Sequence, residues 1–279
     1  MTARAAMPLS GAVVFITGAA QGIGFEAASR FVAAGSRVVL VDVDEEKLGK
    51  AKEQLGMDTI GIVADVRDAA ALAAAAEQAV DTWGRIDVVV ANAGVTPPPA
   101  TLRTIEPDAF QRVIDINLLG AVHTVRATTE HIISSSGHIQ LIGSCAAFAP
   151  GMGGAAYMIS KAGVEQLGRA LRIELATHQV TVGISYFGIV DTALARTTLD
   201  DDPMGQRIGE LLPWPLNKRI DAGHAAASIV DAVGRRRASS TMPRAWIPYA
   251  WLRGVINVLL DQQLAANQTV AAIIRQLER

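Results

Sequence analysis

The chain has 279 residues, of which 50% are hydrophobic and 19% are charged, and its formal net charge is −2. This composition can fill a large hydrophobic core, and the small net charge gives no indication of a nucleic-acid partner. The single cysteine, Cys145, excludes an internal disulfide and a multi-cysteine metal site, and the five histidines lack metal-ligand spacing. We therefore expect a globular protein without a bound metal.

The first predicted elements are an apolar strand over residues 12–17, a glycine-rich turn and an amphipathic helix. The turn and the start of the helix include Gly18, Gln21, Gly22, Ile23 and Gly24. Glycines allow a tight turn and let backbone N–H groups at a helix N-terminus approach a pyrophosphate. This segment predicts a dinucleotide site. The alternative is a turn whose glycines serve its geometry alone.

A second apolar strand, residues 37–42, ends in Asp42. An acid ~20 residues beyond such a glycine turn can accept hydrogen bonds from the adenosine ribose hydroxyls. Because its charge also repels a 2′-phosphate, NAD is predicted as the cofactor in preference to NADP. The next helix is expected to begin after Asp44 and to end at Gly56, which are favourable N-cap and C-cap residues.

Four more apolar strands are predicted at residues 59–64, 87–91, 137–143 and 180–187, with helical patterns between them. Strands that consist mainly of Val, Ile, Leu and Ala are buried on both faces, as in a parallel sheet covered by helices. The predicted fold class is therefore α/β: a single doubly wound parallel sheet, Rossmann-like, with a helical C-terminal extension.

The expected organisation is one domain over residues 8–250, followed by the extension over residues 251–279. The opening segment resembles a signal peptide in having Arg4 before an apolar stretch, but that stretch is the first strand, so no cleavage is expected. No run of 18 apolar residues is present, so no transmembrane helix is predicted and a cytoplasmic protein is expected.

A candidate reaction centre follows the fifth strand. Ser144 ends that strand, and Tyr157 and Lys161 lie four residues apart in a helix predicted over 154–177. This spacing places phenol and ammonium on one helix face, where the cation can lower the tyrosine pKa from ~10. A phenol tuned in this way can exchange a proton with an alcohol or a ketone. The alternative is an exposed surface pair without a catalytic role.

Over residues 8–250 the sequence resembles the short-chain dehydrogenase/reductase family. Its motifs occur here in the family's order and spacing, from the cofactor loop TGAAQGIG onward. The other matching positions are Asp65, Val66, Asn92, Ala93, Gly94, Asn117, Ser144, Tyr157 and Lys161.

The resemblance implies a role for each catalytic residue. Tyr157 would be the acid/base, Lys161 would lower its pKa and bind the nicotinamide ribose, and Ser144 would hydrogen-bond the reacting oxygen. Asn117, within a helix expected over 106–131, would hold a water that links Lys161 to solvent. The alternative for Asn117 is a hydrogen bond between helices.

The resemblance also implies further cofactor contacts. These are Asp65 and Val66 at the adenine, Asn92, Ala93 and Gly94 after the fourth strand, and Gly188, Val190 and Thr192 at the nicotinamide. The sequence departs from the family at Phe187, where proline is usual, and Phe187 is a candidate for the pocket wall near the nicotinamide. Gln21 agrees with NAD, since NADP-dependent members often have Arg or Lys in that loop.

Residues 189–220 correspond to the variable substrate lid of the family. Its large apolar residues are Leu194, Leu199, Met204, Leu211, Leu212 and Trp214. They predict either an apolar cover for the pocket or a lid helix that packs on the body. Beyond residue 244 the large apolar residues are Trp246, Trp251, Val255, Val258 and Leu259. Three alternative roles are open for these residues, in decreasing order of preference: covering the pocket, packing on a partner subunit, and touching a membrane surface.

The predicted function is an NAD(H)-dependent oxidoreductase that interconverts a secondary alcohol and a ketone on an apolar small molecule. One alternative is a 3-oxoacyl thioester reductase, which normally uses NADPH, and another is a non-catalytic dinucleotide-binding sensor. The resemblance also implies a homodimer or homotetramer that pairs through the helices predicted over 106–131 and 154–177.

Overall fold

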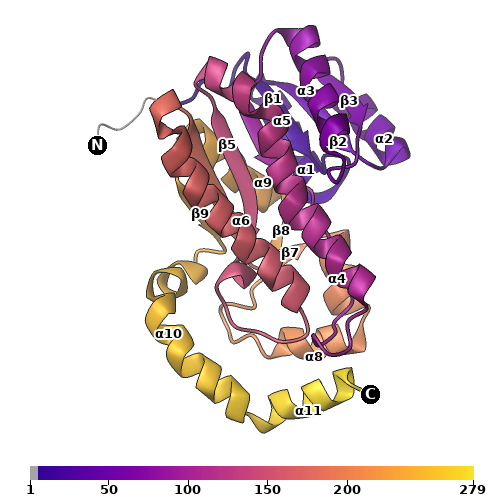
Figure 1. Cartoon of the computed structure of the whole chain (residues 1–279), viewed down its shortest axis with the longest axis vertical. Coiled ribbons are helices and arrows are strands. Elements are labelled where there is room, and N and C mark those ends of the chain that lie inside the picture. Colours follow the sequence, from indigo (N-terminus) through magenta and orange to yellow (C-terminus); the bar gives the residue numbers. More distant parts are fainter. Residues whose placement is uncertain (1–5) are drawn as a thin grey trace.

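A parallel seven-stranded sheet organises the computed structural model, which describes residues 6–279 (Figure 1). The strand order is β3-β2-β1-β4-β5-β6-β9. The strands are β1 (Val13–Thr17), β2 (Arg37–Asp42), β3 (Thr59–Val63), β4 (Val88–Ala91), β5 (His138–Ser144), β6 (Thr181–Phe187) and β9 (Ser239–Met242). The predicted doubly wound α/β fold is confirmed, and the six predicted strands end within one residue of their expected bounds.

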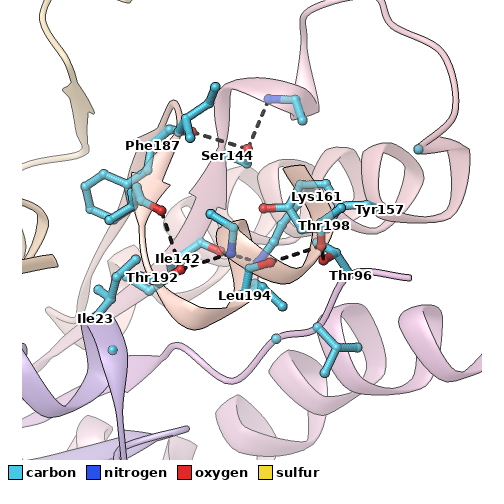
Figure 2. Close-up of a pocket in the computed structure, with 18 of the residues that line it drawn as sticks. Ile23, Thr96, Ile142, Ser144, Tyr157, Lys161, Phe187, Thr192, Leu194 and Thr198 are labelled. Atoms are coloured by element: carbon cyan, nitrogen blue, oxygen red, sulfur yellow. Dashed lines mark hydrogen bonds between the residues drawn. The ribbon is translucent and has the colours of Figure 1, made fainter. Parts of the chain in front are cut away.

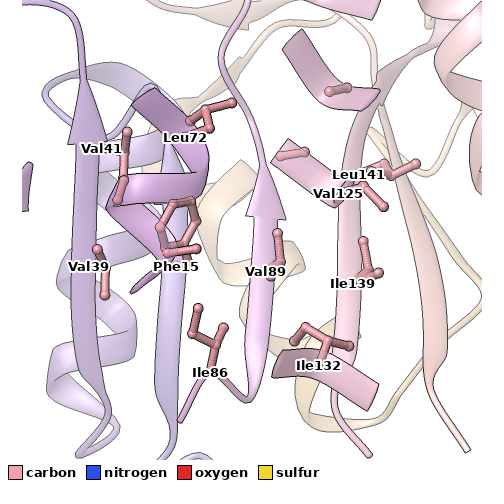
Figure 3. Close-up of a cluster of buried hydrophobic side chains, with 14 of the residues drawn as sticks. Phe15, Val39, Val41, Leu72, Ile86, Val89, Val125, Ile132, Ile139 and Leu141 are labelled. Atoms are coloured by element: carbon pink, nitrogen blue, oxygen red, sulfur yellow. The ribbon is translucent and has the colours of Figure 1, made fainter. Parts of the chain in front are cut away.

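Helices cover both faces of this sheet. They are α1 (Gly22–Ala33), α2 (Glu45–Leu55), α3 (Ala69–Trp83), α5 (Gly120–Ser135), α6 (Ala155–Glu174) and α9 (Ala222–Gly234). Because side chains alternate along a strand, Phe15 packs in the layer that contains α3, α5 and α6, and its neighbour Val14 packs in the layer that contains α1, α2 and α9. Figure 3 shows the first layer. Full burial of each such side chain contributes ~1.5–3 kcal/mol, so both layers stabilise the sheet.

Helix α2 has the ends that its sequence predicts. Its N-cap Asp44 accepts a hydrogen bond from the Lys47 backbone N–H at 3.0 Å. Its C-cap Gly56 has φ of +81°, a conformation that favours glycine.

The topology places a crevice at the carboxyl ends of β1 and β4. From β1 the sheet grows through β2 and β3 on one side and through β4, β5, β6 and β9 on the other. Open α/β sheets bind ligands at such a switch point.

Three short strands have no counterpart in the sequence prediction. β9 is a polar edge strand of sequence Ser-Ser-Thr-Met, so no apolar run signals it. β7 (Val190–Asp191) and β8 (Ile220–Asp221) pair with each other and join the two ends of the lid segment.

The helix predicted over 106–131 is not continuous. It consists of α4 (Pro107–Ile114), a π-helical segment (Asp115–Leu119) and α5. The wider turn contains Asn117, whose side chain binds the backbone of Val95. The π-helical segment is only five residues long, which is too short for hydrophobic periodicity in the sequence to reveal it.

The extension forms two further helices, α10 (Trp246–Ala266) and α11 (Gln268–Leu277), and α11 lies beside α8 (Pro203–Glu210) (Figure 1). The first turn of α10 joins an aromatic cluster in which the rings of Trp246 and Tyr249 are 5.6 Å apart. Within residues 6–279 no helix is long and apolar enough to cross a membrane. Arg4 of the opening segment lies outside the described residues.

Candidate active site

A cavity of about 970 Å³ lies at the carboxyl ends of the central strands. Gly18 follows β1, Asp42 ends β2, Asn92 follows β4, Ser144 ends β5 and Phe187 ends β6, and all five line it. The other predicted site residues in its wall are Gln21, Gly22, Ile23, Asp65, Val66, Ala93, Gly94, Tyr157, Lys161, Gly188, Val190 and Thr192. Gly24 and Asn117 do not line it.

The glycines of the turn have two different tasks. A Cβ on Gly24 would lie 2.0 Å from the Gly18 carbonyl oxygen, and a Cβ on Gly18 would lie 2.8 Å from Ala93 Cα. These two glycines permit close packing, so for Gly24 the purely geometric interpretation holds. A Cβ on Gly22 would meet only Thr192 within 4 Å, at 3.8 Å, because Gly22 faces the cavity.

The N-terminus of α1 fits a phosphate group. Its N-cap Gln21 makes no side-chain capping hydrogen bond, and the first turn contains no acidic residue. The first N–H groups of a helix need an acceptor from outside the helix, and a pyrophosphate supplies one. Gly22 adds open space at the same point, so the residues present fit a dinucleotide.

Asp42 is fixed at the other end of this half of the cavity. One carboxylate oxygen accepts from the Ala20 backbone N–H at 3.0 Å, and the other accepts from the Asp44 N–H at 3.1 Å. A carboxylate held in this way can accept hydrogen bonds from ribose hydroxyls.

Asp65 is engaged in an ion pair. The Arg67 guanidinium donates to it at 2.9 Å and lowers the pKa of that carboxyl. Neighbouring Val66 is buried, and its carbonyl oxygen lies 3.0 Å from His123 Nδ1. Both residues face the cavity, as the family resemblance implies.

Asn92 joins the segment after β4 to the turn after β1. Its amide nitrogen donates to the carbonyl oxygens of Thr17 at 3.0 Å and Gly18 at 2.9 Å. The motif residue Gly94 lies further along, and a Cβ there would be 3.6 Å from Lys161 Nζ. The motif therefore connects the glycine turn to the reaction centre.

Ser144 has a defined orientation (Figure 2). Its hydroxyl donates to the Phe187 carbonyl oxygen at 3.2 Å and accepts from the Ala146 N–H at 3.1 Å. Phe187 is buried and lines the cavity, as expected for a wall residue. Neighbouring Cys145 is also buried, which raises the pKa of its thiol and makes it a packing residue.

Tyr157 and Lys161 lie on the cavity side of α6 (Figure 2). Lys161 Nζ lies 5.7 Å from the centroid of the Tyr157 ring and donates to the Ile142 carbonyl oxygen at 3.0 Å. The pair is not an exposed surface contact, since Lys161 is 5% exposed. Burial lowers the pKa of Lys161 to about 8.

The expected lowering of the Tyr157 pKa is wrong. Burial raises the pKa of the phenol, and a hydrogen bond with Ser144 offsets this only in part. The ammonium of Lys161 points to Ile142, so in this arrangement desolvation outweighs charge attraction.

Asn117 is a buried positioning group. Its amide nitrogen donates to the Val95 carbonyl oxygen at 2.9 Å and to Ser160 Oγ at 3.1 Å, and its oxygen accepts from the Val95 N–H at 2.8 Å. The bond to Ser160 on α6 joins two helices, which is the alternative role expected for Asn117 from the sequence. The water relay stays a prediction.

The substrate half of the cavity contains residues that the sequence does not single out. They are Val95, Thr96, Met158, Thr198 and Ile208. The hydroxyls of Thr96 and Thr198 are hydrogen-bonded at 2.5 Å across 102 residues of sequence (Figure 2). Nearby signals exist for Val95, which follows the motif residue Gly94, and for Met158, which follows Tyr157 in the same helix.

The predicted apolar cover is confirmed only for part of its residues. Leu194, Leu199 and Leu212 of the lid and Trp246 of the extension line the cavity. Outside its wall are Met204, Leu211, Trp214, Trp251, Val255, Val258 and Leu259. Trp214 is 83% exposed and Trp251 is 85% exposed, so these apolar residues face outward.

Comparison with known proteins agrees with this geometry. A family model described as short chain dehydrogenase matches residues 12–203. The chain is 37% identical over 239 residues to 1-deoxy-11-beta-hydroxypentalenate dehydrogenase of Streptomyces avermitilis, with coverage of 83% of this chain and 84% of that protein. It is 32% identical over 270 residues to (-)-trans-carveol dehydrogenase of Rhodococcus erythropolis, with coverage of 84% and 96%.

A solved structure shares the fold. The crystal structure of carveol dehydrogenase from Mycobacterium avium in complex with NAD has a TM-score of 0.74 and 28% sequence identity, with coverage of 84% of this chain and 97% of that chain. The matched family range includes β1 to β6 with the glycine turn and the serine, tyrosine and lysine of the cavity. This chain belongs to the short-chain dehydrogenase/reductase family of oxidoreductases.

Proposed function

We propose that this oxidoreductase uses NAD(H) to interconvert an apolar secondary alcohol and its ketone. One observation carries the proposal: Ser144, Tyr157 and Lys161 share the wall of one cavity, with an uncapped helix N-terminus on one side and an apolar region on the other. This places a proton donor, a hydrogen-bond donor and a cation where a dinucleotide and a substrate can meet. When bound, the nicotinamide supplies the hydride donor or acceptor.

Tyr157 transfers the proton. Its raised pKa keeps the phenol protonated near neutral pH, which suits donation to a ketone oxygen. In the alcohol direction the phenol must accept a proton, and the hydrogen bond with Ser144 favours its charged form. The ammonium of Lys161 is near enough to contribute in the same direction.

Ser144 stabilises the reacting oxygen. Its single proton can be donated to the Phe187 carbonyl oxygen or, after rotation about the Cβ–Oγ bond, to the Tyr157 oxygen or a substrate oxygen. A donor already fixed near the reaction centre stabilises alkoxide character with little reorganisation.

Lys161 binds the nicotinamide ribose and polarises the Tyr157 phenol. One N–H of the ammonium is occupied by Ile142, which leaves two donors for the nicotinamide ribose and the phenol. A pKa of about 8 leaves the group mainly protonated at neutral pH. Asn117 does not line the cavity, but its two hydrogen bonds to the Val95 backbone fix Val95 in the cavity wall.

The charges of the adenosine end favour NAD over NADP. The fixed carboxylate of Asp42 would repel a 2′-phosphate. Two cations of the cavity wall, Arg67 and Arg112, act on Asp65, and the guanidinium of Arg67 is paired with it directly. The residues Asp65, Val66 and Thr192 are assigned to the adenine and carboxamide on the family resemblance.

The cavity wall favours an apolar cyclic alcohol. Leu194, Leu199, Ile208, Leu212 and Trp246 surround the space beyond the reaction centre. Two relatives are named as dehydrogenases of carveol and of a hydroxypentalenate, which supports an alcohol as the substrate class. A 3-oxoacyl thioester reductase is less well supported, because Asp42 opposes NADPH, and a non-catalytic sensor has no need of the three reactive groups.

Assembly and location stay predictions. A homodimer or homotetramer through α5 and α6 agrees with the exposed apolar Ile159 and Ile173 on α6. The exposed stripe of α10, Trp251, Leu252, Val255, Val258 and Leu259, offers a second apolar face. We retain a cytoplasmic location as the expectation.

The Tyr157→Phe variant should lose turnover and keep cofactor affinity. The substitution preserves the ring and removes the oxygen that carries the proton, so kcat for carveol oxidation should fall by ~10²–10⁴. Tyr249→Phe removes a phenol outside the cavity and should retain turnover within a few fold. Steady-state kinetics decide, and a Tyr157→Phe enzyme with more than a tenth of normal turnover would mean that the proton donor is misassigned.

Replacing Lys161 by Met should change the pH dependence of stability. The folded pKa of about 8 lies below the ordinary value of 10.5, so the unfolded state binds more protons between these pH values and stability rises with pH. The unmodified protein should gain ~2 kcal/mol of unfolding free energy between pH 7 and pH 9.5 that Lys161→Met does not gain. Denaturant titrations measure this, with Lys52→Met on the exposed face of α2 as control. Equal pH slopes for all three proteins would contradict it.

The Asp42→Ala variant should narrow the preference for NAD(H). Calorimetric titration of the unmodified protein should give at least ~10-fold tighter binding of NADH than of NADPH, because one carboxylate opposes the 2′-phosphate. Asp44→Ala, which removes the same charge two residues away and outside the cavity wall, should leave the ratio unchanged. Equal or tighter NADPH binding by the unmodified protein would rule out the assignment.

A further inference from the structure

The two ends of the lid segment meet in a short base. It leaves the body at β7 and returns at β8, whose two-residue strands pair Val190 with Ile220 and Asp191 with Asp221. Between them, α8 carries Ile208 into the cavity wall. The hydrogen bond between Thr198 and Thr96 and the donation of Trp246 Nε1 to the Leu216 carbonyl oxygen at 3.1 Å add to this short ladder, and further contacts are needed to keep α8 over the substrate half of the cavity.

Helix α11 supplies such contacts from the outer side. It packs against α8, and Figure 1 shows it running along that side of the lid. Two of its side chains are buried, Val270 at 6% and Ile273 at 1% exposure, and they lie three residues apart on one face. Full burial of side chains of this size contributes ~1.5–3 kcal/mol each, so α11 is firmly docked.

Four separate segments meet at one point beside the cavity. A Cβ on Gly153 would lie 2.8 Å from Ile208 Cδ1, 3.3 Å from Leu277 Cδ1 and 3.7 Å from Pro99 Cβ. Gly153 is in the loop before Tyr157 and itself lines the cavity. Leu277 of α11 therefore lies at the contact between Ile208 of the lid and Gly153 of the body.

Polar contacts fasten the end of α11 to the opposite rim. The Glu278 carboxylate accepts from Arg103 at 2.9 Å and from the Thr101 hydroxyl at 3.2 Å. The Thr104 hydroxyl donates to the Leu277 carbonyl oxygen at 3.2 Å. On the lid side, Arg207 of α8 donates to Gln276. Helix α11 thus joins the lid to the loop of residues 97–104 across the mouth of the cavity.

The other end of the extension is anchored near the reaction centre. Arg253 of α10 pairs with Glu165 on α6 and lies 5.0 Å from the ring centroid of Phe148, and Asn257 donates to the Phe148 carbonyl oxygen at 2.8 Å. The part of α10 from Asn257 to Ala266 spans ~14 Å between this anchor and α11. The lid cannot move away from Gly153 without releasing or carrying α11.

We propose that α11 is a latch that holds the substrate lid closed, so that its docking determines which alcohols the cavity retains and how tightly. The proposal rests on the proposed function for the identity of the substrate. The contacts of α11 described above involve α8, α10, Gly153 and the loop of residues 97–104, and none of them involves Gly22 or Asp42, so we expect cofactor affinity to be independent of the latch.

Hydrogen exchange and kinetics together test the latch. Ile273→Asp places a charge at a buried position of α11. Amide exchange in residues 203–210 should accelerate at least tenfold, and KM for carveol with NAD should rise at least fivefold, while Kd for NADH changes less than twofold. Thr269→Asp, which adds the same charge at an exposed position of the same helix, should change none of these.

A surface variant covers the case in which Ile273→Asp does not fold. Glu278→Arg should repel Arg103 and produce the same two changes, and combining it with Arg103→Glu should restore both by reversing the ion pair. Unchanged exchange in residues 203–210 in folded variants would overturn the latch. Faster exchange with unchanged KM would overturn its role in substrate retention. If the unmodified protein oxidises no alcohol, the proposed function fails, and the exchange data still decide whether α11 holds the lid.

Discussion

The close approach of the turn after β1 to the segment after β4 is the contact on which the site depends. Neither Gly18 nor Gly24 has room for a Cβ, since each would meet backbone atoms at 2.8 Å or less. Asn92 then ties the two segments through the carbonyl oxygens of Thr17 and Gly18. This contact opens the N-terminus of α1 toward the cavity and directs the chain after Asn92 toward Lys161.

The two ends of the cavity have different physical origins. The dinucleotide end is formed by strand ends and their first turns, which the fully buried sheet holds rigidly. The substrate end is assembled from the lid, the loop after β4 and the extension, which meet through side-chain contacts such as Thr96 with Thr198. The substrate end can therefore vary in shape without disturbing the strand ends that form the dinucleotide end.

Burial at the reaction centre has a cost in stability. Desolvation raises the pKa of Tyr157 and lowers the pKa of Lys161, so both groups are shifted toward their neutral forms. The same desolvation strengthens the interaction of either group with a reacting oxygen. The helix α6 carries both, and its packing against β5 and β6 offsets this cost.

The sequence predicts the features that depend on local chemistry. The apolar strands, the caps of α2 at Asp44 and Gly56, and most of the cavity wall agree with prediction, because each depends on residue type and spacing. The strand β9 and the π-helical turn at Asn117 were missed, because neither alters an apolar pattern.

The substrate end could not be predicted in this way. Trp214, Trp246 and Trp251 are all tryptophans in apolar stretches of the sequence. Of the three, only Trp246 faces the cavity. Which face of an apolar helix is buried depends on tertiary packing, and here it depends on the aromatic cluster around Phe148. The pKa of Tyr157 likewise follows from burial, which spacing alone does not reveal.

The most direct measurement follows the hydrogen that leaves the alcohol. A secondary alcohol that the enzyme oxidises is labelled with deuterium at its carbinol carbon and incubated with the enzyme and NAD, and the reduced cofactor is examined by mass spectrometry. Direct transfer predicts that the NADH carries the deuterium and that the label slows turnover. Unlabelled NADH, with the deuterium released to solvent, would contradict hydride transfer between substrate and nicotinamide in this cavity.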